Sequence, residues 1–284
     1  MASKPTRSRA LASAFASVLV LGTLAPAALA KSPKAPPKPV VLKPKALQAL
    51  KEKLVGEPAK QIEGLAAAKN AGPAAVGAAP EIEGILTKGS TGPIVIAAID
   101  ALGALGQGTS ARALEPYLRH RLPDVRRAAA RALGLTKGPE AITALRAGLH
   151  SSDGQVRGFS ALGLGKQGSK AALPDLENAL EHDIPESAIA IGELCSGAEC
   201  DRFASHLGKL PFEVMTSGFD TIFLRTPAPP DDALIKLVNQ IRDLGTGDAR
   251  RYLGELYNRM PGASKPLKKA IEDAIASIVG GNKK

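Results

Sequence analysis

Four histidines are the residues whose type and spacing most suggest chemistry. His120, His150, His182 and His206 follow one another at steps of 30, 32 and 24 residues, and neutral imidazole is a common metal ligand. Each lies at or near the end of a predicted helix, where an imidazole also interacts favourably with the helix dipole. Packed helices are about 8 to 10 Å apart, whereas each ligand must come within about 2 Å of a metal ion. His120 and His182 are two repeats apart and cannot share an ion. Only His150 with one neighbour stays open, and we predict no metal site.

Carboxylates and sequence motifs give no sign of catalysis. Acidic and basic residues alternate on the predicted second helices, and this mixed solvated surface comprises Glu115, Glu177, Glu181, Arg112, Arg119 and Arg146. No G-x-S-x-G, Walker, dinucleotide-binding or H-E-x-x-H motif occurs. The stretch GLGKQGSK at 163–170 resembles a phosphate loop, but it lacks the Walker spacing and follows a predicted helix rather than a strand. We therefore expect no enzyme, no catalytic residue and no cofactor.

The two cysteines, Cys195 and Cys200, stand close together in LCSGAECDRF. Two thiols alone make a poor zinc site, and no C-x-x-C-H haem motif is present. In an exported protein such a pair more often forms a disulfide than a reactive site. We predict a disulfide between them.

The first thirty residues have the pattern of a signal peptide. Lys4, Arg7 and Arg9 precede an apolar run of about 15 residues, and Ala28-Leu29-Ala30 supplies a small-x-small cleavage pattern. A membrane-spanning helix requires about 20 apolar residues. We predict cleavage after Ala30, export to the periplasm or the exterior, and no transmembrane span in the mature chain. An uncleaved anchor is the alternative.

Net charge separates a basic tether from a nearly neutral body. The 284-residue chain carries +10, and removal of residues 1–30 takes away three positive charges and leaves +7. Five lysines between residues 31 and 45 account for most of the remainder, so the body carries +2. The segment 31–44 is rich in Lys and Pro and predicts a disordered, extended tether, which allows weak contact with anionic surfaces. The body lacks the coherent basic stripe of a nucleic-acid-binding surface, so we expect no nucleic-acid partner.

A 31-residue repeat organises the body. Gly72, Gly103, Gly134 and Gly165 are each 31 residues apart, and the apolar residues on both sides keep the same step. The spacing of three or four between apolar residues predicts one amphipathic helix before each glycine and one after it. We expect the glycine to end the first helix in a conformation that other residues find costly. A hairpin of this size must stack on its neighbours to bury its apolar faces, and the sequence predicts an all-α solenoid.

The repeat resembles the HEAT-like repeats of the kind also found in phycobilisome lyases. Their V-R-x-x-A-x-x-A-L-G pattern is matched within DVRRAAARALG at 124–134 and, less closely, within QVRGFSALGLG at 155–165. The resemblance covers three repeats between residues 93 and 180. It implies a buried Val and Ala face, and an acidic residue, here Asp124, that works with the motif Arg to tie adjacent repeats. It says little about function, since such repeats serve scaffolds and lyases alike.

The pattern changes beyond these repeats. Gly192 comes only 27 residues after Gly165, which predicts a first helix shortened by one turn. We assign 45–210 to HEAT-like repeats and 211–284 to divergent helical repeats with a C-terminal cap, about fifteen helices in all. In the divergent part Phe212, Phe219 and Phe223 share one helix face, which is either a binding surface or, as we favour, filling for the gap beside the shortened repeat.

The second helices are the best candidates for binding. Tyr117, Arg119, Arg146 and His150 are the candidate residues, because repeat stacks commonly bind partners along a concave surface. We expect a non-enzymatic exported scaffold for a protein or peptide partner. The alternative is a lyase-type enzyme or enzyme accessory that acts on a chromophore or an envelope polymer.

Overall fold

The computed structural model describes residues 41–278, which belong to one compact unit that begins at Pro39. The predicted signal peptide and most of the predicted tether lie outside the described residues. Within residues 41–278 the chain forms fifteen α-helices, four short 3₁₀ helices and no strand. The α-helices are α1 Pro44–Leu54, α2 Pro58–Ala71, α3 Ala79–Lys88, α4 Gly92–Leu105, α5 Ala111–Leu114, α6 Pro123–Leu135, α7 Pro139–Gly148, α8 Gly154–Lys166, α9 Leu173–Glu181, α10 Glu186–Leu194, α11 Ala198–Ala204, α12 Phe212–Leu224, α13 Asp231–Arg242, α14 Gly247–Arg259 and α15 Lys265–Ser277. The 3₁₀ helices are η1 Gly72–Ala78, η2 Gly108–Ser110, η3 Glu115–Arg119 and η4 Lys170–Ala172.

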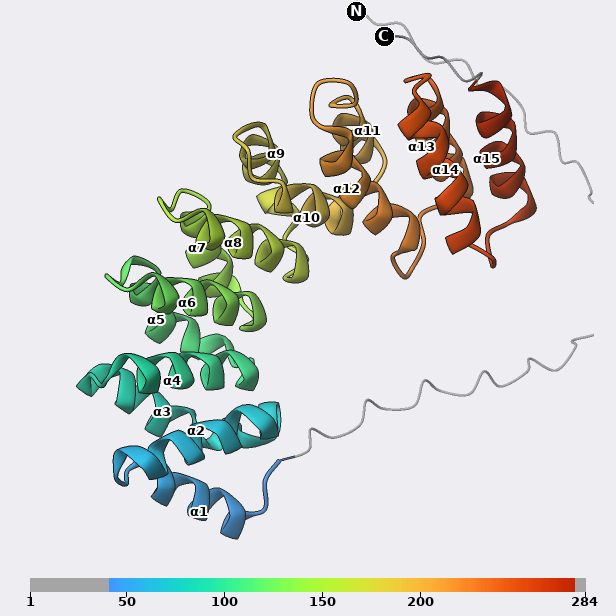
Figure 1. The fold of residues 1–284 in the computed structure, drawn as a ribbon. Helices are drawn as coiled ribbons and strands as arrows, with labels where there is room; N and C mark the ends of the chain where they lie inside the picture. Colours follow the sequence, from blue (N-terminus) through green and yellow to red (C-terminus); the bar gives the residue numbers. More distant parts are fainter. Residues whose placement is uncertain (1–40, 279–284) are drawn as a thin grey trace, which may run out of the picture. The chain divides into compact units, whose positions relative to one another are not determined.

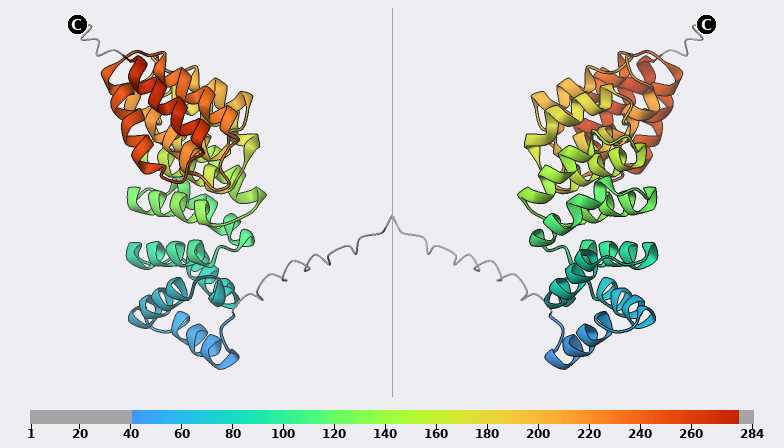
Figure 2. Two further views of the ribbon diagram at one scale, coloured as in Figure 1. Left: turned by 90° about the vertical axis from the view of Figure 1, so that its right-hand side faces the viewer. Right: turned by 90° about the vertical axis from the view of Figure 1, so that its left-hand side faces the viewer.

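The helices stack in chain order as the repeat predicts, which confirms an all-α solenoid (Figures 1 and 2). The first helices α2, α4, α6, α8, α10 and α12 form one row, in which each helix packs closely on the next. The second helices α3, α5 with η3, α7, α9 and α11 form another row, whose members contact one another much less. Within this unit the first-helix row lies on the inner side of the curved stack (Figure 1). The expectation that second helices line the concave side is therefore wrong, because the more closely packed row takes the inner position.

The repeated glycines bring the first helices close together. Gly103 lies inside α4, and a Cβ on it would stand 2.7 Å from the Cα of Ala132 in α6. A Cβ on Gly134 would stand 3.1 Å from the Cα of Gly163 in α8. The prediction that these glycines end their helices is wrong: only Gly72, with φ of 56°, follows the last residue of its helix. At Gly103, Gly134 and Gly165 the 31-residue step instead marks a close contact with little or no room for a side chain.

The ends of the first helices are closed by residues that the repeat pattern did not single out. Gly106, in the left-handed conformation with φ of 68°, ends α4. The Gln167 side chain donates to the carbonyl of Leu133 near the end of α6. Arg225 donates to the carbonyl of Gly192 at 2.9 Å, near the end of α10. Side chains from the following repeat thus satisfy carbonyls that a helix leaves unpaired at its C-terminus.

The HEAT-like motif forms the core, as the resemblance implies. Val125, Ala128, Ala129, Ala132 and Leu133 of α6 are all buried, and Leu133 has no exposed surface. Residues of this size pack into the narrow space between helices whose backbones approach closely.

The shortened repeat is confirmed. Helix α10 has nine residues, four fewer than α8. Cys195, which follows the last residue of α10, and Cys200 in α11 lie at disulfide distance, with their Cα atoms 5.1 Å apart. Phe219 and Phe223 are buried, and Phe219 meets Phe203 edge-on with ring centroids 5.2 Å apart. Phe219 and Phe223 therefore fill the core beside the shortened repeat, whereas Phe212 is only partly buried and meets Tyr252 of α14 edge-on.

Candidate functional site

A buried aspartate ties two first helices together at the edge of the candidate site. Asp153 caps α8, where its carboxylate accepts from the amides of Gln155 and Val156. The same carboxylate accepts from Arg126 at 3.0 Å and from Arg127 at 3.2 Å, both on α6, and its side chain is only 4% exposed. Burial by itself would raise the pKa of Asp153, but the hydrogen bonds from these two arginines and from the Val156 amide outweigh it and hold the pKa below its usual value.

This arrangement corrects the expectation about Asp124 and gives Arg127 a partner in the next repeat. Asp124 does not tie the repeats: its side chain is 82% exposed and reaches only Arg127, at 3.8 Å on the same helix. Arg127 does not lie on a freely solvated face, because it pairs with Asp153. The tie is made by the acidic residue that caps the next first helix, a partner that lies 26 or 27 residues away in the sequence.

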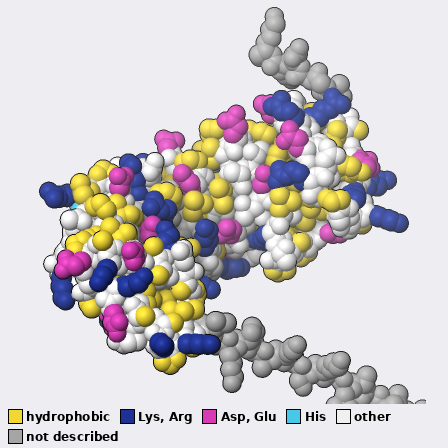
Figure 3. Space-filling view, turned by 60° about the horizontal axis from the view of Figure 1, so that its bottom comes forward, with side chains coloured by type: hydrophobic (Ala, Val, Ile, Leu, Met, Phe, Trp, Pro, Cys, Tyr) yellow, Lys and Arg dark blue, Asp and Glu magenta, His cyan; other side chains and the backbone are white. Residues whose placement is uncertain are grey.

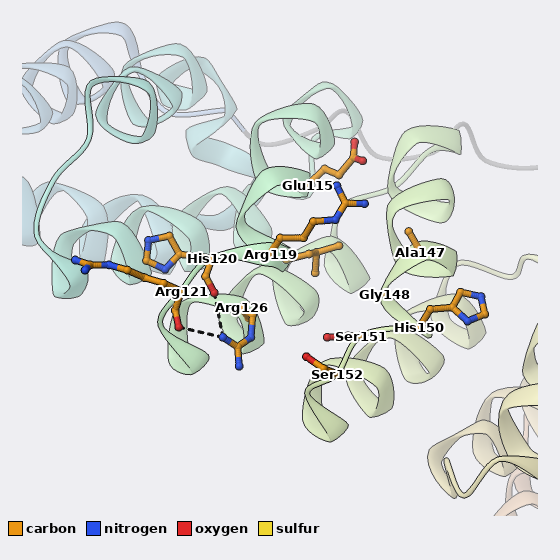
Figure 4. A pocket seen from close by; sticks show the side chains of 11 residues that line it. Glu115, Arg119, His120, Arg121, Arg126, Ala147, Gly148, His150, Ser151 and Ser152 are labelled. Atoms are coloured by element: carbon orange, nitrogen blue, oxygen red, sulfur yellow. Dashed lines mark hydrogen bonds between the residues drawn. The ribbon is translucent and has the colours of Figure 1, made fainter.

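Arg126 extends from this tie to the edge of a cavity between two second helices. Its guanidinium also donates to the carbonyls of His120 at 3.0 Å and Arg121 at 3.1 Å, in the loop that follows η3 (Figure 4). The cavity has a volume of about 530 Å³ and opens between η3 and the end of α7. Its lining residues are Glu115, Leu118, Arg119, His120, Arg121, Arg126, Ala147, Gly148, His150, Ser151 and Ser152. Ser151 and Ser152 lie across the cavity from Arg119 (Figure 4).

The charges of this cavity differ from those elsewhere on the second helices. Arg112, Arg146 and Arg202 each pair with a carboxylate of a neighbouring second helix. Within residues 41–278, by contrast, no carboxylate lies within 4.0 Å of Arg119 or Arg121. Arg119, Arg126, Ser151 and Ser152 line this cavity, whereas the Arg121 side chain extends away from the serines (Figure 4). Such donors suit an anionic group, and carboxylates are bound strongly by charge-assisted hydrogen bonds.

A second cavity continues the first by one repeat. It has a volume of about 350 Å³ and shares His150 and Ser151 with the first cavity. Arg157 and His182 also line it. Arg157 donates to the carbonyl of Ser151 at 2.9 Å, as Arg126 does to that of His120. We call the two cavities together the loop groove.

The four predicted binding residues have different surroundings. Arg119 and His150 line the first cavity. Tyr117 is half-buried and donates its hydroxyl to the carbonyl of Leu86 at 2.8 Å, and burial raises its pKa. Arg146 pairs with Asp175 on the next second helix. The structure thus brings Arg119 and His150 together and gives Tyr117 and Arg146 partners within the stack.

Several residues of the loop groove were missed by sequence reasoning. These are Arg121, Arg126, Ser151, Ser152 and Arg157. Arg126 and Arg157 are the arginines of the repeated V-R pair, 31 residues apart. That step was the available signal, but the resemblance assigned this arginine only to tying the repeats.

The rest of the described chain has no metal-ligand cluster and no membrane-spanning helix. Within residues 41–278, no group of three or more His, Cys, Asp or Glu side chains is close enough to hold a metal ion. None of the helices in that part of the chain is both long and apolar enough to span a membrane. The face in Figure 3 shows Lys and Arg interspersed with Asp and Glu rather than gathered into one basic stripe.

Comparison with known proteins identifies the repeat. The family described as HEAT repeats matches residues 85–157 and 111–194, and no curated protein matches the chain. Among solved structures, the chain is similar to the complex of CpcE and CpcF of phycocyanin lyase from Nostoc sp. PCC7120, at 17% identity and a TM-score of 0.45, over 89% of this chain and 100% of that one. It is also similar to an engineered protein, at 19% identity and a TM-score of 0.44, over 83% and 69% of the two chains. A designed armadillo repeat protein matches at 11% identity and a TM-score of 0.39, over 82% and 100%.

The family match covers the central repeats, in which the V-R motif, the buried Ala and Leu face and the stacked hairpins coincide. The described chain is an all-α solenoid, and its central repeats, residues 85–194, are similar to HEAT repeats.

Proposed function

We propose that this chain is a non-enzymatic scaffold that binds a segment of another protein in the loop groove. The observation that carries the proposal is that Arg119 and Arg121 border an open cavity without a carboxylate within 4.0 Å in residues 41–278. The other arginines named on the second helices are paired with neighbouring helices. A charge that contributes no ion pair to the stack remains available to a partner.

We also propose that the scaffold acts after export, in the periplasm or outside the cell. The proposal is supported by the charged, apolar and small-residue segments of residues 1–30. The Cys195 and Cys200 pair at disulfide distance fits an oxidising compartment. N-terminal sequencing of the mature protein tests the proposal: we expect Lys31 as the first residue, and a retained Met1 or Ala2 would contradict it.

Capture of the partner tests the binding proposal. The mature chain, immobilised, is exposed to an envelope fraction beside two variants. The first variant combines Arg119→Ala with His150→Ala, and the control carries Arg250→Ala, an exposed arginine of α14 far along the chain from the groove. We expect one protein to be retained by the wild type and the control but not by the groove variant. Equal retention by all three, with circular dichroism showing all three folded, would contradict binding in this groove.

A further inference from the structure

We propose that the loop groove binds two acidic side chains of one partner segment, through arginines that lie one repeat apart. In this proposal, which rests on the proposed function, Arg119 with Arg126 holds one carboxylate of the partner and Arg157 holds the next. The partner segment is extended, in the polyproline II conformation, and carries an acidic residue at every third position.

The two arginines of the V-R pair occupy equivalent places. Arg126 and Arg157 each stand in the first turns of a first helix, in α6 and α8. Each donates to a carbonyl of the preceding loop, at 3.0 Å from His120 and 2.9 Å from Ser151. Each also lines one of two adjoining cavities. The repeat therefore presents the same donor twice along one groove.

The available charge differs slightly between the two places. Arg126 shares its charge with Asp153, at 3.0 Å, and the first cavity adds Arg119 beside it. For Arg157, no carboxylate lies within 4.0 Å in the described part of the chain. Each cavity thus retains at least one arginine that is not paired with a carboxylate within the described residues, and each can take one acidic side chain.

The spacing of the helices sets the spacing of the ligand. Helices α6 and α8 pack directly on one another, and packed helices lie about 8 to 10 Å apart. A polyproline II segment rises about 3.1 Å per residue with three residues per turn, so residues three positions apart are about 9 Å apart on the same face. In a β-strand, residues three positions apart point to opposite faces. Polyproline II is therefore the conformation that places two carboxylates at both arginines.

The groove favours an acidic peptide over a nucleic acid. Glu115 lies in the first cavity and Asp175 in the second, and both would repel a continuous phosphate backbone. Spaced carboxylates can avoid them, because a peptide places neutral residues between its charges. On the face drawn in Figure 3, Lys and Arg are also interspersed with Asp and Glu, which disfavours a continuous phosphate backbone there.

The test uses synthetic peptides of Pro, Gly and Ser as probes. One peptide carries two Glu residues three positions apart, a second carries them two positions apart, and a third has Gln in both places. Affinity for the mature chain is measured by fluorescence anisotropy at low salt. We expect the first peptide to bind about fivefold more tightly than the second, the gain expected from one additional exposed ion pair, and the third not to bind.

Protein variants assign the binding to the groove. Arg119→Gln and Arg157→Gln should each weaken the first peptide about fivefold and abolish the preference for its spacing. Arg250→Gln, which removes the same charge from an exposed position of α14, should leave the affinity unchanged, and the thermal midpoints of all variants should match. Equal affinity for the two acidic peptides would overturn the proposal. So would a single-stranded oligonucleotide that binds more tightly than either peptide with the same dependence on Arg119 and Arg157.

Failure of this inference can be distinguished from failure of the proposed function. If neither acidic peptide binds while the partner captured from the envelope fraction still requires Arg119 and His150, the spacing proposal is wrong and the scaffold proposal stands. If the peptides fail and capture is also independent of these residues, both are wrong.

Discussion

The two helix rows of this stack are made by the same repeats yet have opposite character. In the first-helix row, glycine meets alanine or glycine, as at Gly103 with Ala132 and Gly134 with Gly163, and the backbones come close together. In the second-helix row, the helices are joined by exposed ion pairs such as Arg146 with Asp175, and cavities open between them.

The difference shows that the size of the residues at the helix contacts decides which row stabilises the stack. Close packing buries small apolar side chains and accounts for stability, whereas exposed ion pairs contribute little. The row that contributes little to stability can vary its side chains, and it forms the loop groove together with the loops beside it and with Arg126 and Arg157 of the first helices.

The largest effect is expected at the centre of the first-helix row. Leu133→Ala should lower the free energy of unfolding by about 2 to 5 kcal/mol, because a side chain with no exposed surface is replaced by a cavity. Leu135→Ala, two residues along the same helix at a side chain that is 52% exposed, is the matched control and should cost under about 0.5 kcal/mol. Chemical denaturation measures both, and equal costs would mean that the faces of α6 are wrongly assigned.

The next effect tests the tie between first helices. Asp153→Ala should cost about 2 to 4 kcal/mol, because it removes a helix cap and leaves Arg126 and Arg127 without their carboxylate. Asp124→Ala, at an exposed carboxylate on α6, should cost under about 0.5 kcal/mol. A larger loss for Asp124→Ala would restore it as the residue that ties the repeats.

The contribution of Asp153 should also depend on pH. Its pKa is lower in the folded protein than the usual value of about 3.9. A depressed pKa means that the stabilisation is fully present above the unfolded-state value and is lost as the pH falls through the folded-state value. The stability difference between wild type and Asp153→Ala should therefore be constant above about pH 5 and shrink below about pH 4. A difference that grows on acidification would contradict this sign.

A moderate effect on stability is expected from one added methyl group in the first-helix row. Gly103→Ala should destabilise the protein by about 1 to 3 kcal/mol, because its Cβ would stand 2.7 Å from the Cα of Ala132. Gly84→Ala in α3 has no atom within 4 Å of the added carbon and should stabilise the protein by about 0.5 to 1 kcal/mol through helix propensity. Opposite signs for the same substitution would confirm the contact, and two stabilising results would refute it.

The smallest effect is expected in the second-helix row. Arg146→Ala removes an exposed ion pair with Asp175 and should cost under about 1 kcal/mol. The cost should decrease further in high salt. A loss as large as that of Leu133→Ala would show that the second-helix row also carries the stability of the stack.

Most of the fold could be predicted from the sequence, and part of the site could not. The 31-residue step and the apolar spacing predict the helices, but a repeated glycine looks the same whether it ends a helix or lies in a close contact, and only the position of Ala132 beside Gly103 decides. Arg119 and His150 were found from their place on second helices. Arg126 was missed as a groove residue because its partners, a loop carbonyl and Asp153, come together only when two repeats stack.

The most direct test of the division between rows measures stability and binding in the same two variants. One variant carries Arg119→Gln and Arg157→Gln in the loop groove, and the other carries Gly103→Ala in the first-helix row. For each, the free energy of unfolding and the affinity for the acidic peptide with three-residue spacing are determined. The groove variant should unfold within about 0.5 kcal/mol of the wild type and bind the peptide at least tenfold more weakly, as two lost ion pairs imply. The Gly103→Ala variant should be less stable than the wild type and, while folded, should bind the peptide with unchanged affinity. A groove variant that loses stability but still binds would contradict the account.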